Sequence, residues 1–254
     1  MRVLDRRNGN MIPAETLQAT HPAAAPEKGL VALAAPDSPA AEQYRVLYQR
    51  LARLAARRPM RVIAVTSASR GEGRTTSAAN LALTAAQEGR TVVLVDADLR
   101  RPSLASLFGL APRAGVAEVL DGSAELSQAV VRVGQLSVLC AGEVRDASAA
   151  IRHPRTAALV EQLRAAYDLV VLDAPPALAF ADGERLAGAA DAAVLVVRAG
   201  ATPRQVVRLA LESLGDLAAG VVLNDVDPET VAHGRWLYGG AREAAPAIAN
   251  RRAG

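Results

Sequence analysis

The sequence predicts an α/β fold in which a doubly wound, mostly parallel sheet is covered by helices on both faces, giving three αβα layers. Short apolar segments rich in valine and leucine alternate with segments of helical periodicity along most of the 254 residues. A glycine-bearing turn follows the first apolar segment, and acidic or amide side chains stand at the ends of three later ones. Because ligands of such sheets bind at the carboxyl ends of the strands, we expect these polar residues to form one site.

The chain divides into a central domain and two tails. Residues 1–37 mix alanine, proline and charged residues without a period, and we expect a flexible tail there. The domain is expected over residues 38–226, and a second flexible tail over 227–254, where the sequence is again polar and aperiodic. The domain opens with a helix signal, because Ser38 is a good N-cap and Pro39 suits the first helical position.

The expected elements alternate along the domain. Runs such as T-V-V-L-V are typical of strands that are buried on both faces of a parallel sheet. Strands are expected at 61–66, 91–97, 136–140, 169–173, 192–197 and 220–224. Further helices are expected at 75–87, 103–108, 115–120, 124–131, 154–166, 182–189 and 203–214. On the first helix, the residues at helical spacing that should face the core are Tyr44, Leu47, Leu51 and Leu54.

Composition excludes several functions. Aromatic residues make up only 3% of the chain, which argues against stacking platforms for single-stranded nucleic acid, and the formal charge is only +3. Cys140 is the single cysteine and the three histidines are far apart, so we expect neither a disulfide nor a zinc site. No signal-peptide pattern is present, and no apolar run approaches the roughly 18 residues of a membrane span. We therefore expect a cytoplasmic protein that does not bind nucleic acid.

The stretch Val62–Thr76 reads V-I-A-V-T-S-A-S-R-G-E-G-R-T-T, a strand, a glycine turn and a helix start. This order forms a phosphate cradle, because Gly71 and Gly73 allow backbone angles that a Cβ forbids and the helix dipole adds positive charge. The stretch departs from G-x-x-x-x-G-K-[ST], since Ala68 holds the first glycine position and Arg74 the lysine position. It predicts a P-loop of deviant Walker type whose nucleotide-binding residues are Ser69, Arg70, Gly71, Glu72, Gly73, Arg74, Thr75 and Thr76.

Three aspartates at strand ends suit a metal. Asp96 and Asp98 are two residues apart, so their side chains are expected on one face, where a divalent cation would relieve their repulsion. Asp173 follows V-V-L in the pattern of a Walker B aspartate. Mg²⁺ takes one or two carboxylates together with phosphate oxygens, and a hydroxyl at the helix start adds a further ligand. The sequence therefore predicts a nucleotide–Mg²⁺ site, with Thr75 and the aspartates at positions 96, 98 and 173 as candidate metal ligands.

Five segments in this order resemble the bacterial tyrosine kinases (BY-kinases), the P-loop protein-tyrosine kinases of capsular and exopolysaccharide biosynthesis, which are related to Min and Par type ATPases. The segments are S-P-A-A-E-Q-Y-R, T-S-A-S-R-G-E-G-R-T-T, V-L-V-D-A-D-L-R-R-P, Y-D-L-V-V-L-D-A-P-P and G-V-V-L-N, within residues 38–226. The resemblance implies a P-loop NTPase fold and transfer of the γ-phosphoryl group of ATP to tyrosine with the help of Mg²⁺.

The resemblance also implies a role for each site residue. Arg74 stands where the phosphate-binding lysine belongs, Asp98 would bind the metal, and Asp96 would orient or deprotonate the attacking tyrosine hydroxyl. These three are the expected catalytic residues. Asp173 would hold metal-bound water, and Asn224 is similar to the residue that contacts adenine in related ATPases.

Partners follow from the same resemblance. The family assembles through E-x-x-R-x-x-R on its first helix, and here Glu42 and Arg45 match while Tyr48 holds the third position, so a homo-oligomer through this helix is expected. A membrane adaptor of the chain-length-determinant type would recruit the chain to the inner face of the membrane. The family carries autophosphorylated tyrosines at its C-terminus, which makes Tyr238 a possible phosphosite.

Two other interpretations stay open. Arg74 and the tyrosine-poor tail also fit a catalytically degenerate, nucleotide-binding regulator or scaffold of a polysaccharide export complex. A partition-type ATPase fits the fold and the basic isoelectric point. Those ATPases carry a second lysine early in the loop, and Ser69 at that position favours the kinase.

Overall fold

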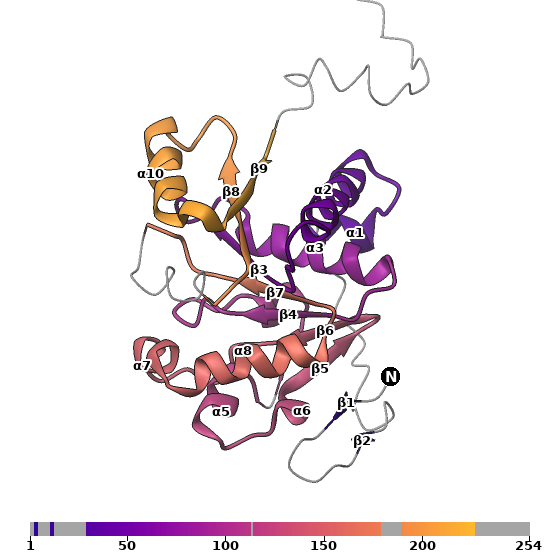
Figure 1. Cartoon of the computed structure of the whole chain (residues 1–254), viewed down its shortest axis with the longest axis vertical. Coiled ribbons are helices and arrows are strands. Elements are labelled where there is room, and N and C mark those ends of the chain that lie inside the picture. Colours follow the sequence, from indigo (N-terminus) through magenta and orange to yellow (C-terminus); the bar gives the residue numbers. More distant parts are fainter. Residues whose placement is uncertain (1–2, 5–10, 13–28, 113, 179–188, 227–254) are drawn as a thin grey trace, which may run out of the picture. The chain divides into compact units, whose positions relative to one another are not determined.

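The computed structural model describes residues 3–4, 11–12, 29–112, 114–178 and 189–226 of the chain. Within these residues the main sheet has seven strands in the order β5-β6-β4-β7-β3-β8-β9 (Figure 1). All neighbouring strands run parallel except β5 and β6. The strands are β3 (Val62–Ser67), β4 (Val92–Asp96), β5 (Val130–Val133), β6 (Leu136–Leu139), β7 (Leu169–Asp173), β8 (Ala192–Arg198) and β9 (Ala218–Asn224). A separate two-residue pair, β1 (Val3–Leu4) and β2 (Met11–Ile12), is antiparallel.

Helices cover both faces of the main sheet, so the expected three-layer architecture is confirmed (Figure 1). Within β4, Val92 and Leu94 face one apolar cluster, whereas Val93 and Val95 face the other. One layer contains α1 (Val31–Ala34), α2 (Pro39–Ala55), α3 (Arg74–Gln87) and α4 (Leu104–Leu107). The opposite layer contains α5 (Val116–Asp121), α6 (Leu126–Ala129), α7 (Ala147–Arg152), α8 (Arg155–Ala166) and α10 (Arg204–Leu214), which the 3₁₀ turn η2 (Gly215–Leu217) follows.

The register of the central strands determines where the polar residues lie. Asp96 at the end of β4 is the cross-strand neighbour of Asp173 at the end of β7. Asp173 is in turn the neighbour of Val65, two residues before the end of β3. Since these strands are parallel, the glycine loop after β3 and both strand-end aspartates lie at the same edge of the sheet.

Helix α3 lies against the sheet with α2 packed on its outer side. Alanine dominates α3, and ten of its fourteen residues are buried, because small side chains let it approach the sheet and α2 at once. Helix α2 begins as expected, since the Ser38 hydroxyl accepts a hydrogen bond from the Ala41 N–H at 3.2 Å. Its Leu51 is buried and Leu47 packs against the same cluster, which confirms the core-facing stripe at these positions.

Several short elements differ from expectation. Residues 130–131 were expected at the end of a helix but begin the antiparallel edge strand β5, which continues to Val133. Three valines favour a strand there, and Gly134, with φ of 57°, permits the tight turn to β6. The sequence did not predict α7, which Asp146 caps by accepting from the Ala149 N–H at 3.0 Å. The helix expected at 182–189 falls, apart from Ala189, outside the described residues.

The expected boundary at residue 38 requires a correction. Leu30 is fully buried and Ala32 is 3% exposed, both in the cluster that contains α3. The Asn80 side chain donates to the Gly29 carbonyl and accepts from the Ala32 N–H, each at 2.9 Å. Residues 29–37 therefore belong to the folded domain, because burial of Leu30 and these hydrogen bonds offset the cost of ordering the segment.

Among the described helices, none is long and apolar enough to cross a membrane.

Candidate nucleotide-binding site

The glycine loop has the backbone that its sequence predicts. Gly71 and Gly73 have φ of 76° and 83°, in the left-handed region that favours glycine. Gly73 is also sterically restricted, because a Cβ there would lie 2.0 Å from the Asn224 Nδ2 atom, whereas a Cβ at Gly71 would meet nothing within 4 Å. Position 73 therefore requires glycine both for its positive φ and for lack of space, whereas position 71 requires it for its positive φ alone.

The Glu72 side chain and two residues from distant parts of the chain, Thr202 and Asn224, hold this loop in place. The Glu72 side chain points inward, and its Oε2 accepts a hydrogen bond from the Ser69 N–H at 3.0 Å. Its Oε1 accepts from the Thr202 hydroxyl. The Asn224 Nδ2, at the end of β9, donates to the Glu72 carbonyl at 3.0 Å. These contacts make Glu72 and Asn224 supports of the loop, and an adenine contact by Asn224 stays a prediction.

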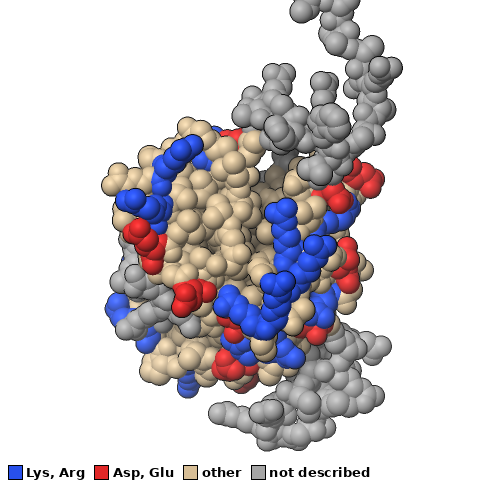
Figure 2. All heavy atoms as spheres, turned by 45° about the horizontal axis from the view of Figure 1, so that its top comes forward, with Lys and Arg blue, Asp and Glu red and all other residues tan. Residues whose placement is uncertain are grey.

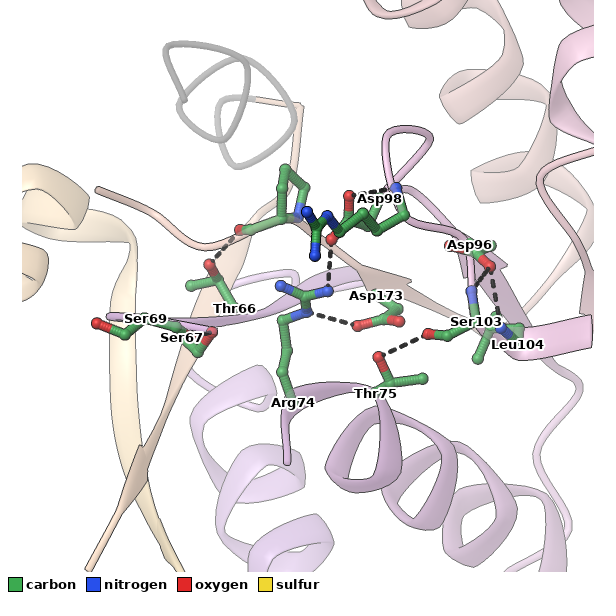
Figure 3. A network of polar contacts seen from close by, with 12 residues as sticks. Thr66, Ser67, Ser69, Arg74, Thr75, Asp96, Asp98, Ser103, Leu104 and Asp173 are labelled. Carbon is green, nitrogen blue, oxygen red and sulfur yellow. Dashed lines mark hydrogen bonds and ion pairs between the residues drawn. The ribbon is translucent and has the colours of Figure 1, made fainter. Parts of the chain in front are cut away.

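Arg74, the first residue of α3, joins two acidic side chains, one from the turn after β4 and one from the end of β7 (Figure 3). Its Nη2 donates to the Asp98 Oδ2 at 2.7 Å and its Nε donates to the Asp173 Oδ1 at 2.9 Å. The three side chains are 11%, 7% and 0% exposed. Such a pairing compensates charges that would be costly to bury alone. The guanidinium therefore neutralises the two carboxylates that were predicted to bind metal.

Asp96 has different partners from Asp98, although both were expected to share one face. Strand β4 ends at Asp96, so Asp98 lies in the following turn. The Asp96 Oδ2 accepts from the N–H groups of Ser103 and Leu104 at 2.9 and 3.0 Å, and its carboxylate lies toward α4 (Figure 3). Burial, followed by the charge of Asp173 across the strands, raises the pKa of Asp96 to about 7.

Two buried carboxylate oxygens at the site, Asp96 Oδ1 and Asp173 Oδ2, have no hydrogen-bond partner within the described part of the chain. The Asp173 Oδ2 makes no hydrogen bond there, and burial raises the pKa of this carboxyl against the opposing effects of Arg74 and Thr75. The Thr75 hydroxyl lies 3.1 Å from the Ser103 hydroxyl. An unused carboxylate oxygen near a hydroxyl fits a hard cation. The described residues contain no group of three or more His, Cys, Asp or Glu suited to a metal, so phosphate and water must complete the shell of an Mg²⁺ ion.

The remaining predicted residues lie at three places. Ser69 and Arg70 are exposed at the loop, and Thr76 is in the first turn of α3. Glu42 and Arg45 lie on α2, where they form an ion pair of 2.7 Å, and Arg45 also donates to the Pro36 carbonyl at 2.7 Å. This pair therefore supports the segment that precedes α2, and its role in assembly stays a prediction. Tyr238 falls outside the described residues.

Sequence reasoning missed two hydroxyl residues that complete the site. Ser103 contacts both Thr75 and Asp96, and Thr202 contacts Glu72. Each precedes a helix, α4 or α10, after a turn, which is a position that serine and threonine favour. The helix starts were visible in the sequence, but the distant partners of these residues were not.

A glycine loop between a strand and a helix, with aspartates at the ends of neighbouring parallel strands, defines a P-loop NTPase. The ParA family model, described as NUBPL iron-transfer P-loop NTPase, matches residues 58–210. The tyrosine-protein kinase YwqD of Bacillus subtilis (strain 168) is 33% identical over 223 residues, which cover 85% of this chain and 93% of YwqD. The chain therefore belongs to the bacterial tyrosine kinases, a family of ParA-type P-loop proteins.

Other relatives extend this comparison. The succinoglycan biosynthesis transport protein ExoP of Rhizobium meliloti (strain 1021) is 35% identical over 203 residues, which cover 76% of this chain but 26% of ExoP. The kinase domain of the Escherichia coli tyrosine kinase ETK has a TM-score of 0.74 and 27% identity, covering 88% of this chain and 84% of that one. The septum site-determining protein MinD of Pyrococcus horikoshii, complexed with Mg-ADP, has a TM-score of 0.55 and 25% identity, covering 67% and 75%.

Proposed function

We propose that the chain is an ATP-dependent protein-tyrosine kinase, acting on itself among other substrates, that regulates capsular or exopolysaccharide synthesis and export. The names of YwqD, ETK and ExoP support this activity and this setting. The observation that carries the proposal is the meeting of Arg74, Asp98 and Asp173 below a loop with two left-handed glycines. These groups have the chemistry that binds and positions a triphosphate.

Each group would serve the transfer in a distinct way. Backbone N–H groups of the loop and of the first turn of α3 would bind phosphate oxygens, and Arg74 would turn from its carboxylates to the phosphate. Asp98, Asp173 and Thr75 would hold Mg²⁺, in line with the Mg-ADP complex of MinD. When bound, that ion neutralises charge that develops on the transferring group. Phosphoryl transfer depends mainly on such positioning and charge stabilisation.

We propose that Asp96 accepts the proton of the attacking tyrosine hydroxyl. Its Oδ1 is buried without a partner among the described residues, and its pKa of about 7 suits a group that gains and loses a proton near neutral pH. The side chain is fully buried behind Ser103 and Leu104. The role therefore requires movement of the turn that starts α4 when a substrate tyrosine enters.

One observation favours a second candidate, a nucleotide-binding regulator or scaffold without kinase activity. The planar guanidinium of Arg74 binds two carboxylates at once, which a lysine ammonium at this position would do with less directional specificity. Loading Mg²⁺ requires that these ion pairs separate. If they hold too firmly, the protein binds nucleotide but positions its γ-phosphate poorly, and turnover is lost.

We further propose that a membrane adaptor of the chain-length-determinant type recruits the chain to the inner face of the membrane. The name of ExoP, a transport protein nearly four times longer than its matched part, supports a link to an export complex. Glu42 and Arg45 on α2 would contribute to homo-oligomers, and Tyr238 would receive phosphate.

A phosphorylation assay tests the proposed activity. The full chain is incubated with ATP and Mg²⁺ and probed with an anti-phosphotyrosine reagent, beside Asp98→Asn and, as a matched control, Asp146→Asn at the start of α7. Phosphotyrosine in the native and control proteins but not in Asp98→Asn supports the kinase. Nucleotide binding without phosphotyrosine supports the regulator, and ATP-dependent, salt-sensitive DNA binding would support a partition ATPase instead.

A further inference from the structure

A groove lies between helix α2 and the edge strand β9, apart from the nucleotide site. On α2, Leu47, Leu51 and Leu54 supply apolar lining, and residues 219–221 of β9 form the facing wall. In a view toward this part of the surface, basic side chains line one side of a hollowed region that is otherwise uncharged (Figure 2). The groove therefore combines an apolar interior with a charged margin.

Arginines make up that margin. Arg50, Arg53 and Arg57 line the groove, are exposed, and recur at the spacing of one helix face. Within the described part of the chain, no hydrogen bond or ion pair engages these three side chains, whereas Arg45 on the same helix pairs with Glu42. No acidic residue lines the groove. The margin is thus a row of positive charge without a counter-charge among the described residues.

Strand β9 offers backbone hydrogen-bonding groups to the same groove. It is the last strand in the sheet order, so its outer edge is unpaired within the described residues. The Ala199 N–H donates to the Asn224 carbonyl, which fixes Asn224 as a residue whose backbone faces β8. By alternation, the N–H and C=O groups of Val221 and Leu223 face away from the sheet. Their side chains are 49% and 56% exposed, and an edge of this kind favours pairing with a further strand.

We propose that this groove binds an acidic segment of a partner protein, which pairs in extended conformation with the edge of β9. Strand addition supplies backbone hydrogen bonds, and side chains of the added segment select the partner. Carboxylates on alternate residues recur about every 6.6 Å. Arg50, Arg53 and Arg57 recur about every 4.5–6 Å along α2, so successive carboxylates would meet successive arginines.

Other occupants fit the charges or the shape less well. Residues 1–28 and 227–254 each contain four basic and three acidic residues, so neither segment of this chain is acidic. A second copy that paired edge to edge would bring a second row of arginines near the first, and like charges repel. An anionic bilayer would contact exposed arginines but would not follow a groove beside a strand edge. The proposal goes beyond the kinase activity and does not depend on it.

A peptide-binding experiment on the full chain tests the proposal. The probe is a fluorescein-labelled peptide of alternating glutamate and valine, as long as the seven residues of β9, and binding is followed by fluorescence anisotropy. We expect saturable binding that weakens by about tenfold or more in an Arg50→Glu/Arg53→Glu variant. The matched control, Arg204→Glu/Arg208→Glu on α10, should bind as the native chain does. Val221→Pro, which removes an outward N–H, should also weaken binding while circular dichroism confirms the fold.

Four results would overturn the proposal. The first is equal binding of a peptide with lysine in place of glutamate. The second is binding that neither the α2 variant nor Val221→Pro changes, and the third is no binding at millimolar peptide. The fourth is occupation of the groove by a different partner. Sedimentation showing a dimer that Val221→Pro abolishes would assign the edge to a second copy, and arginine-dependent binding to phosphatidylserine vesicles without peptide binding would assign α2 to a membrane.

Discussion

Replacement of Arg74 by methionine tests the electrostatic account of the site. The change keeps most of the side-chain length but removes the guanidinium that bonds Asp98 at 2.7 Å and Asp173 at 2.9 Å. Both carboxylates are nearly or fully buried, so neither can regain water in compensation. Removal of one partner from a buried ion pair costs about 3–5 kcal/mol, and we expect a loss of this size in EDTA at neutral pH.

Magnesium should reverse much of that loss. Once Arg74 no longer occupies Asp98 and Asp173, the two carboxylates can bind a divalent cation, and binding to the folded state alone raises stability. Thermal unfolding in EDTA and in Mg²⁺ measures both effects, and the expected loss corresponds to about 10 °C in the melting temperature. The Mg²⁺-dependent gain should be larger in Arg74→Met than in the native chain.

Arg164 provides the matched control. It also forms an arginine–aspartate pair, with Asp191 at 2.6 Å, but the two side chains are 25% and 20% exposed. Arg164→Met should therefore cost less, about 1 kcal/mol, and should show no added response to Mg²⁺. An Arg74→Met protein as stable as the native chain in EDTA, or one that Mg²⁺ does not rescue, would refute the reasoning.

Three further predictions concern other parts of the domain. Gly73→Ala should abolish ADP binding in a calorimetric titration, whereas Gly71→Ala should only weaken it. Both glycines have positive φ, but only Gly73 lacks room for a Cβ. Equal effects of the two substitutions would contradict this reasoning. Asp96 is more easily protonated in the folded chain than in the unfolded one, so its contribution to stability is present below pH about 4 and lost as pH rises to about 7. Asp96→Asn should therefore gain stability relative to the native chain between pH 5 and pH 8 in EDTA, and a difference that is the same at both values would exclude this titration. Leu30→Ala should reduce the free energy of unfolding in urea by about 2–5 kcal/mol, because the fully buried side chain leaves a cavity, whereas a loss near zero would place residue 30 outside the folded domain.

The long elements and the loop were predictable because local sequence determines them. Runs of β-branched residues such as V-V-L-V favour strands that are buried on both faces, and glycines at positions 71 and 73 indicate positive φ. The short elements β5, α1 and α7 were missed since four to six residues give too little periodicity for a prediction. Tertiary contacts, with β6 for β5 and with α3 for α1, stabilise two of them.

The site was predictable as a set of residues but not as a set of contacts. Spacing placed Asp96, Asp98 and Asp173 at strand ends, and the sheet brings those ends together. Their individual partners depend on turns that follow the strands, so the sequence could not show that Asp96 caps α4 or that Arg74 bridges the other two. The inward position of Glu72 likewise depends on Thr202, which is 130 residues away along the chain.

The most direct test of the nucleotide site is a calorimetric titration of the full chain with ADP, with and without Mg²⁺. We predict saturable binding that strengthens in Mg²⁺ and that loses this dependence in an Asp98→Ala variant. Binding that is absent, or equally strong in EDTA and in Mg²⁺, would contradict the claim that Asp98 and Asp173 hold a nucleotide with its metal.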